Sequence, residues 1–316
     1  DVSPADGGLV YTSGRAMYRV DASGAGRAQI ADASPDPAIP EAPWLANPVW
    51  SPDGARIAYT NNGIALYDVA SGTSTLILPN DPQPNFDDPN YLQPEAPPQG
   101  YNTRSWSPDG SRLLIDAYIY FSEGSALTVL DLVSGGMTRL SSPGGITCCY
   151  PSWSADGQSV YISADAVGII VPGLWRLDAA SGEGYTLIDG LANELTQGTY
   201  LLIAYPKLMP SDGRLYYFGA TTANIDRPPR LGMYRSLADG ATELTQIRSD
   251  TYCFADEALW ANDGSGAVVS DISGSTGQCE SYPASFPYIG ELLWLPTDGS
   301  EAVVLAAAGR SARWGK

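Results

Sequence analysis

Three features of this 316-residue sequence predict an all-β fold, a six-bladed β-propeller of four-stranded antiparallel blades. A tryptophan followed by a Ser-Pro-Asp-Gly type of turn recurs along the chain. A second signature, a short alternating strand that ends in a Gly-containing turn, recurs between the copies of the first. The repeating unit is about 50 residues long, and such a unit cannot bury both of its faces alone, so neighbouring units must stack against each other.

The tryptophan motif reads VWSPDG at 49–54, SWSPDG at 105–110 and SWSADG at 152–157. Its Asp-Gly pair occurs five times, at intervals of 47 to 56 residues, with the aspartates at Asp53, Asp109, Asp156, Asp212 and Asp263. The residues three positions earlier are Trp50, Trp106, Trp153, Met209 and Trp260. We expect these large side chains to pack between blades. We expect the aspartates to form turns rather than a metal ring, because Asp bonds to its own backbone and Gly accepts a positive φ.

The strand signature reads IALYDVASG at 64–72 and LWRLDAASG at 174–182, and it has six copies. The first copy precedes the first tryptophan motif, and Trp314 lies 54 residues after Trp260. The two ends of the chain are therefore expected to share one blade, with the ring closed by the C-terminal strand pairing into the N-terminal blade. The predicted organisation is a single domain, 1–316, with blades at 1–45 plus 311–316, 46–100, 101–147, 148–202, 203–254 and 255–310.

Taken together, the WSPDG motif and the strand signature resemble the TolB-type, WD40-like propeller repeat. The resemblance covers nearly the whole chain and implies the propeller fold. It leaves function open, because this repeat serves scaffolds, peptidase gates and some lyases. The related lyases rely on histidines for their metal, and this chain has no histidine.

Composition excludes several classes of function. The formal net charge is −18, which repels phosphate backbones, so a nucleic-acid partner is not expected. No apolar run approaches the ~18 residues of a membrane helix, so membrane insertion is not expected either. The absence of histidine removes imidazole acid–base chemistry and His-containing triads, and the sequence has no GxSxG motif. These features predict a protein that is not an enzyme.

The long connections of the blades are expected on one face. Successive antiparallel strands reverse direction, so connections between second and third strands leave on the same side as those between blades. Long loops on a rigid scaffold commonly carry binding. The predicted binding residues at this channel mouth are Trp44, Asp87, Asp88, Tyr91, Tyr101, Tyr150, Tyr252, Phe254, Asp256 and Glu257. The alternative is that the aromatic side chains fasten the loops onto the blades.

Calcium is the one cofactor that the loop chemistry allows. The ion takes six to eight oxygen ligands, and Asp81, Asp87 and Asp88 with nearby carbonyls could supply several. The sequence has no spaced DxDxDG run. A solvated acidic loop that binds no metal is therefore the default expectation.

Four cysteines, all in predicted loops, are the remaining feature. Cys253, in a loop expected at 247–258, and Cys279 lie in connections that leave the same blade on the same side, so a disulfide between them is plausible. Cys148 and Cys149 could then form a vicinal disulfide; alternatively, one of them pairs with Cys253 or Cys279, or both stay free. The even cysteine count favours an oxidising compartment, extracellular or periplasmic.

The function that these features favour is a non-catalytic secreted or periplasmic binding or scaffold propeller. Its long acidic and aromatic loops would engage a protein, a peptide or a glycan. The first alternative is a structural subunit of an extracellular assembly, a surface layer or filament, in which the partner is another copy of the chain. The second alternative is an enzyme of the propeller lyase or hydrolase type, which the missing histidine and GxSxG motif disfavour.

Overall fold

The computed structural model shows only β-strands as regular elements in the residues that it describes. These residues are 9–13, 15–21, 26–33, 45–83, 97–120, 125–143, 150–164, 172–190, 200–222, 230–261, 263–271, 279 and 290–309. They fall into two compact units that divide between Arg139 and Leu140. In these ranges no helix is long and apolar enough to span a bilayer.

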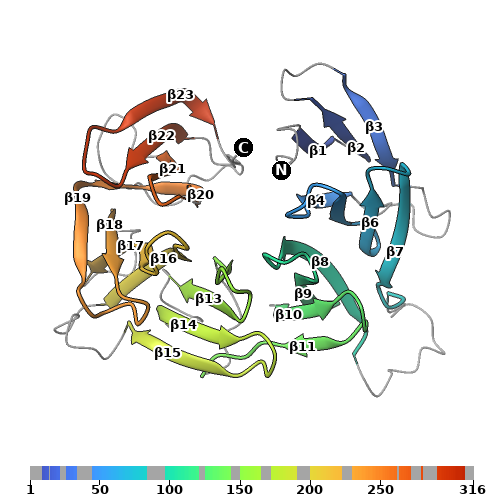
Figure 1. Ribbon diagram of the computed structural model, residues 1–316, viewed down its shortest axis with the longest axis horizontal. Coiled ribbons are helices and arrows are strands. Elements are labelled where there is room, and N and C mark those ends of the chain that lie inside the picture. The colour runs from blue at the N-terminus through green and yellow to red at the C-terminus, as the bar shows by residue number, and fades with distance from the viewer. Residues whose placement is uncertain are drawn as a thin grey trace. The chain divides into compact units, whose positions relative to one another are not determined.

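The first unit contains three antiparallel sheets, drawn from blue to green in Figure 1. The first sheet comprises β1 (Leu9–Ser13), β2 (Ala16–Val20) and β3 (Ala28–Asp32). The second comprises β4 (Ala46–Trp50), β5 (Arg56–Thr60), β6 (Gly63–Asp68) and β7 (Thr73–Pro79). The third comprises β8 (Gln99–Trp106), β9 (Arg112–Ile119), β10 (Ser125–Asp131) and β11 (Met137–Arg139). In each sheet, strands that follow one another in the chain are hydrogen-bonded neighbours.

The second unit contains three further sheets of the same kind, coloured from yellow-green to red in Figure 1. The first comprises β12 (Ser152–Trp153), β13 (Ser159–Ala164), β14 (Gly173–Asp178) and β15 (Gly184–Asp189). The second comprises β16 (Tyr200–Leu208), β17 (Leu215–Thr222), β18 (Leu231–Ser236) and β19 (Thr245–Tyr252). The third comprises β20 (Phe254–Trp260), β21 (Gly266–Asp271), β22 (Gly290–Pro296) and β23 (Val303–Gly309).

Six antiparallel sheets follow one another along the chain. This arrangement confirms the predicted fold class, a six-bladed β-propeller. Five sheets show all four strands. The fourth strand of the first sheet was predicted at 311–316, which lies outside the described residues, so closure of the ring by that segment stays a prediction. The prediction that 1–316 forms a single domain stays a prediction as well.

The tryptophans pack between neighbouring blades, as predicted. In the first unit Trp106 of β8 is 7% exposed and lies in a core cluster that joins Ile64 of one blade to Leu113 of the next. Its indole Nε1–H donates to the carbonyl of Val49, 3.0 Å away in the preceding blade. In the second unit Trp260 stacks on Phe218 at 5.0 Å between ring centroids. These side chains supply the apolar area that a blade cannot bury alone.

The repeated aspartates form turns, also as predicted. At the β8–β9 turn the carboxylate of Asp109 accepts hydrogen bonds from the Ser107 hydroxyl at 2.6 Å, the Ser111 amide at 3.1 Å and the Ser111 hydroxyl at 2.8 Å. Gly110 follows at a φ of 69°, a conformation that favours glycine. The side-chain bond from Ser107 and the bonds from Ser111 lower the pKa of Asp109 to about 2.

Replacing Asp109 by asparagine should lower the free energy of unfolding by about 1 kcal/mol at pH 7, a value discounted because the carboxylate is exposed. A depressed pKa contributes stability above about pH 4, and the contribution is lost as pH falls towards 2, so the difference between wild type and variant should vanish there. Urea unfolding at several pH values measures it. The control Val133→Ala, at an exposed turn of the same sheet, should show no such dependence of stability on pH. If the loss of stability in Asp109→Asn did not change with pH, the lowered pKa of Asp109 would be contradicted.

Candidate functional site

The long connections all leave one end of the blades within each unit. The four longest join β3 to β4 (33–45), β7 to β8 (80–98), β11 to β12 (140–151) and β21 to β22 (272–289). Each runs between blades or between the second and third strands, which antiparallel order places at the same end of a sheet. The connections at the opposite end are shorter, from turns such as 107–111 up to the eight residues 237–244. This end is therefore where variable sequence can form a binding surface.

One predicted loop is wrong. Residues 247–258 were expected to form a long connection, but β19 and β20 occupy nearly all of them and Cys253 alone joins the two strands. The segment was expected to connect two blades as a loop, but it belongs to two strands, and in β19 Arg248 and Asp250 bind each other. Phe254, Asp256 and Glu257 consequently lie in β20.

Four of the predicted binding residues, Trp44, Asp87, Asp88 and Tyr91, lie outside the described residues. The structure describes the surroundings of Tyr101, Tyr150 and Tyr252, each in a different sheet or at its margin. Tyr101 belongs to the first unit, and the other two belong to the second.

Two side chains at the start of the connection between β7 and β8 bind the backbone of β8, where the connection ends. Asn80 Oδ1 accepts the amide of Tyr101 at 2.8 Å, and Asp81 Oδ2 accepts the amide of Gln99 at 2.8 Å. The Asp81 amide returns a bond to the Gln99 carbonyl at 2.9 Å. The ring of Tyr101 is 6% exposed and packs in the core cluster around Trp106. Burial, and secondarily the charge of Asp81, raises the pKa of Tyr101.

Two tyrosines that the sequence did not single out complete this cluster. Tyr118 and Tyr120, at the end of β9, are partly exposed and meet edge to face at 5.6 Å. The ring of Tyr118 covers Gly100 so closely that a Cβ there would lie 2.2 Å from Cζ. The hydroxyl of Tyr120 donates to the Asp81 carbonyl at 3.2 Å. Their signal was the alternation YIY opposite a glycine across the strand pair.

We call Asn80, Asp81, Tyr101, Tyr118 and Tyr120 the tyrosine cluster. Burial, the neighbouring Tyr118 and Asp81 raise the pKa of Tyr120 to about 12, so its hydroxyl stays protonated and remains a donor at neutral pH. Burial likewise raises the pKa of Tyr118. The cluster offers neutral aromatic edges and hydroxyls beside an acidic connection, which suits polar recognition rather than proton transfer at pH 7.

The described residues contain no group of three His, Cys, Asp or Glu side chains placed to hold a metal ion. Asp81 uses one carboxylate oxygen to bind the Gln99 amide. The other two predicted calcium ligands, Asp87 and Asp88, lie outside the described residues. The calcium site therefore stays a prediction.

In the second unit Tyr150 and Tyr205 share an unusual backbone. Both have a positive φ, 48° and 55°, and each precedes a proline. Their rings lie 4.1 Å apart between centroids. A non-glycine residue at positive φ is strained, and a bulge in β16 accommodates Tyr205 while Trp260 Nε1 binds its carbonyl at 2.7 Å. Tyr205 lies at the bulge within β16, and its ring meets that of Tyr150, which lies just before β12.

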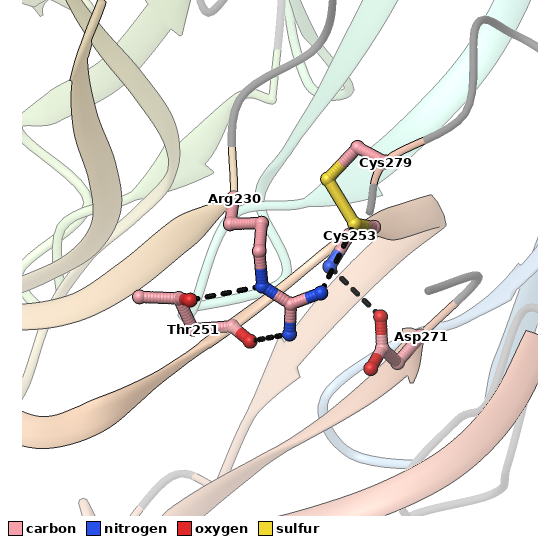
Figure 2. Close-up of a disulfide and its surroundings, with 5 residues drawn as sticks. All are labelled: Arg230, Thr251, Cys253, Asp271 and Cys279. Carbon is pink, nitrogen blue, oxygen red and sulfur yellow. Dashed lines mark hydrogen bonds between the residues drawn. A yellow bond between two sulfur atoms is a disulfide. The ribbon is translucent and has the colours of Figure 1, made fainter. Parts of the chain in front are cut away.

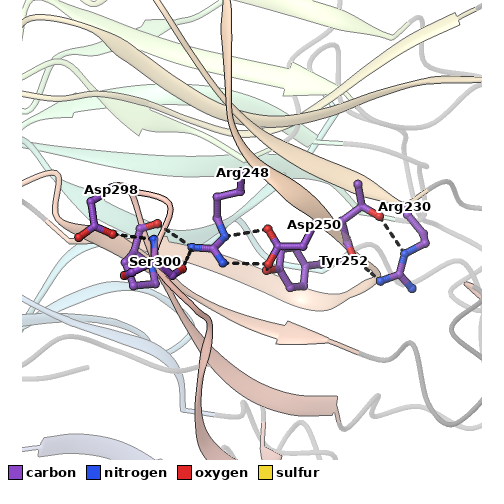
Figure 3. Close-up of polar contacts among 8 residues, drawn as sticks. Arg230, Arg248, Asp250, Tyr252, Asp298 and Ser300 are labelled. Carbon is purple, nitrogen blue, oxygen red and sulfur yellow. Dashed lines mark hydrogen bonds and ion pairs between the residues drawn. The ribbon is translucent and has the colours of Figure 1, made fainter.

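Tyr252 belongs to a partly buried polar network (Figure 3). The guanidinium of Arg248, whose side chain is 4% exposed, forks onto Asp250 with bonds of 2.9 and 2.8 Å. Its Nη1 also donates to the carbonyls of Pro296 at 2.9 Å and Ser300 at 2.5 Å. Tyr252 donates its hydroxyl to Asp250. Burial favours a raised pKa for Asp250, but the bonds from Arg248 and Tyr252 outweigh it and lower the pKa.

The predicted disulfide between Cys253 and Cys279 is present, with an S–S distance of 2.02 Å and a Cα–Cα distance of 5.5 Å (Figure 2). It closes a sequence separation of 26 residues, which stabilises the fold by roughly 3.5 kcal/mol in the chain-entropy account. Cys148 and Cys149 lie outside the described residues, so their pairing stays open.

Solved structures with the same arrangement of blades decide the kind of fold. TolB from Acinetobacter baumannii superposes with a TM-score of 0.53 at 16% identity, over 92% of this chain and 61% of that chain. The fold is a TolB-type, WD40-like propeller. An oligogalacturonate lyase from Vibrio parahaemolyticus matches this propeller with a TM-score of 0.62 at 12% identity, over 97% of this chain and 78% of that one.

A puromycin hydrolase mutant matches the TolB-type propeller with a TM-score of 0.58 at 16% identity, over 98% of this chain but 45% of the hydrolase. No family model and no curated protein matches the sequence. The propeller thus spans 61% of the TolB chain, and its structural neighbours include enzymes as well as proteins that are not enzymes. At these identities the likeness establishes the fold and leaves the activity undecided.

Proposed function

We propose that this propeller is a non-catalytic binding or scaffold module, secreted or periplasmic, that engages a protein, peptide or glycan at the end of its blades where the long connections leave. The tyrosine cluster is the observation that carries the proposal. It places two partly exposed aromatic side chains, with protonated hydroxyls, at the end of β9 beside the base of the connection between β7 and β8. Rigid amphipathic rings lose little conformational entropy on binding, which favours recognition.

Charge indicates the kind of partner. The chain carries a net charge of −18, and the connection after Asp81 contains Asp87, Asp88 and Glu95. A negative field of this size attracts basic partners and accelerates their encounter. A peptide or protein segment with Lys, Arg and aromatic residues is therefore the partner chemistry that we favour.

Two features support a non-catalytic role and an oxidising location. The sequence has no histidine, and the described residues contain no metal-binding group of three acidic, Cys or His side chains. The Cys253–Cys279 disulfide is of the kind that persists in extracellular and periplasmic compartments. The fold itself supports neither assignment, since the same propeller occurs in a lyase and a hydrolase.

Selection of displayed random peptides on the oxidised chain tests this proposal. We expect enrichment of basic peptides with aromatic residues, and we expect Tyr120→Ala to weaken their binding about tenfold, or about 1.4 kcal/mol. Titration calorimetry on synthetic copies of the selected peptides gives the measurement. Adding calcium to the same titrations shows whether Asp81 and its neighbours need the ion.

Val133→Asp is the matched control. Val133 is 91% exposed at the turn between β10 and β11, at the opposite end of the same sheet, so this variant should bind the selected peptides as wild type does. If Tyr120→Ala bound the selected peptides normally while Val133→Asp lost affinity for them, the peptides would bind at the end of the sheet that carries the β10–β11 turn, and the proposal would be wrong.

One observation favours the structural-subunit alternative. The outermost strand β23 exposes three consecutive aliphatic side chains, Val303, Val304 and Leu305, at 50, 55 and 54%. A sheet edge of this kind can pair with another chain. Light scattering on the samples used for the titrations separates the two functions, because an assembly subunit would grow in mass with concentration without any peptide.

A further inference from the structure

The two sulfurs of the disulfide have unequal surroundings (Figure 2). Cys253 is 4% exposed and forms the single-residue connection between β19 and β20. Cys279 is partly exposed. A thiol arriving from solution therefore reaches Cys279 more readily than Cys253.

Among the described residues, a positive charge lies against the buried sulfur, Cys253 Sγ. Arg230 Nη1 is 3.7 Å from Cys253 Sγ. The guanidinium is held in this position by Thr251, whose hydroxyl accepts from Nε at 3.0 Å and whose carbonyl accepts from Nη2. Because Thr251 fixes the guanidinium on two sides, the charge is in place before any thiolate forms.

Thiol–disulfide exchange depends on which sulfur is attacked and on how well the other leaves. The attacked sulfur must be accessible, and the departing sulfur carries away a negative charge that a neighbouring cation stabilises. Access favours attack at Cys279, and the guanidinium favours departure of Cys253. The difference in access and the difference in charge therefore favour the same reaction, attack at Cys279 with Cys253 as the leaving group.

We propose that Cys279 is a site of reversible modification by low-molecular-weight thiols, with Cys253 as the leaving thiolate held by Arg230. A thiolate such as that of glutathione attacks Cys279 Sγ, forming the mixed disulfide and breaking the Cys253–Cys279 bond, and Cys253 departs as a thiolate. A second glutathione thiolate attacks the glutathione sulfur of the mixed disulfide. Cys279 leaves as a thiolate, and oxidised glutathione forms, so the protein disulfide gains the two electrons that two glutathiones lose.

Asp271 opposes Arg230 at this site. Its Oδ1 accepts the backbone amide of Cys253 at 2.8 Å, which places a carboxylate near the departing sulfur. The two variants Arg230→Gln and Asp271→Asn therefore remove charges of opposite sign from the same surroundings. This proposal is independent of the binding function, because it concerns only the disulfide and its neighbours.

Peptide mass mapping tests the direction of attack in the wild-type protein. The oxidised chain is treated briefly with glutathione, free thiols are trapped with iodoacetamide, and the peptides are identified. Glutathione on Cys279 with carbamidomethyl on Cys253 is the expected pattern. Glutathione on Cys253, or an even distribution, would overturn the proposal without need of any variant.

The rate at which glutathione opens the Cys253–Cys279 disulfide tests the role of the Arg230 charge. Arg230→Gln should slow opening by about threefold, on the order of what one pKa unit in a reacting thiol produces. Arg230→Lys, which keeps the charge, should restore most of the rate, and Asp271→Asn should not slow it. An unchanged rate in Arg230→Gln, with thermal unfolding of the oxidised variant like that of wild type, would refute the assignment of Arg230.

Discussion

Replacing Trp106 by alanine is expected to lower the free energy of unfolding by about 3–5 kcal/mol, the range for loss of a large buried aromatic side chain. The indole is 7% exposed, and its core cluster draws residues from two successive blades. The guanidinium of Arg56 lies 4.8 Å from its ring, and Arg56 also donates to the Gly110 carbonyl at 3.1 Å. The variant therefore loses packing on both sides of the boundary between blades and leaves the Val49 carbonyl without its donor.

Chemical denaturation followed by circular dichroism measures this loss. The variant Trp106→Phe separates the contribution of apolar packing from that of the hydrogen bond to Val49. Phenylalanine keeps most of the apolar contact but cannot donate to Val49, so it should cost about 1–3 kcal/mol. Val133→Ala, at a position 91% exposed, should cost nothing measurable. If Trp106→Ala changed stability by under 1 kcal/mol, the tryptophan repeat would not be what joins the blades.

The repeat could be predicted from sequence because the interactions that form it join residues close together in the chain. A turn such as Ser107–Asp109–Gly110 needs only residues that are adjacent in the chain: hydroxyl, carboxylate and a glycine at φ 69°. The large apolar residue before each turn, tryptophan in four of the five, marks the preceding strand in the same way. Five local repeats then specify the blades without any knowledge of long-range contacts.

The candidate site was less predictable because it depends on contacts between distant strands. Tyr120 meets Asp81 across 39 positions of sequence, and Tyr118 covers Gly100 only because β8 and β9 pair in one register. Neither relation has a sequence motif. Proximity of the cysteines was inferred correctly from topology, since both lie at the same end of one blade, whereas Arg230 beside Cys253 had no signal in the sequence.

The mistaken loop at 247–258 has a specific physical origin. The loop was expected because the segment lies between two blades, where other connections are long, yet Arg248 is 6% exposed in β19. Its burial is tolerated because Asp250, two residues on and on the same face of the strand, neutralises it, and because the turn after β22 supplies two carbonyls. A buried charge whose hydrogen bonds are made to a nearby carboxylate and to distant carbonyls looks the same in sequence as an exposed one.

Replacing Arg248 by methionine is consequently expected to lower the free energy of unfolding by about 3–5 kcal/mol at neutral pH, because it leaves the carbonyls of Pro296 and Ser300 without donors and Asp250 without its counter-charge. The side chain of Asp250 is 41% exposed and can regain some hydration, which places the expected cost towards the lower end. Arg248→Lys keeps the charge but loses the planar fork, so it should recover only part of the loss.

A double-mutant cycle with Asp250→Asn isolates the pair from the rest of the network. The two single losses should exceed the double loss by about 1 kcal/mol or more, as measured by urea unfolding, because each partner is costly only while the other remains. The pKa of Asp250 is lowered in the folded chain, so the pair stabilises above the ordinary aspartate pKa and the coupling should fade as pH drops below about 4. Additive losses at pH 7 would mean that the two carbonyls, and not the carboxylate, hold Arg248 in place between the blades.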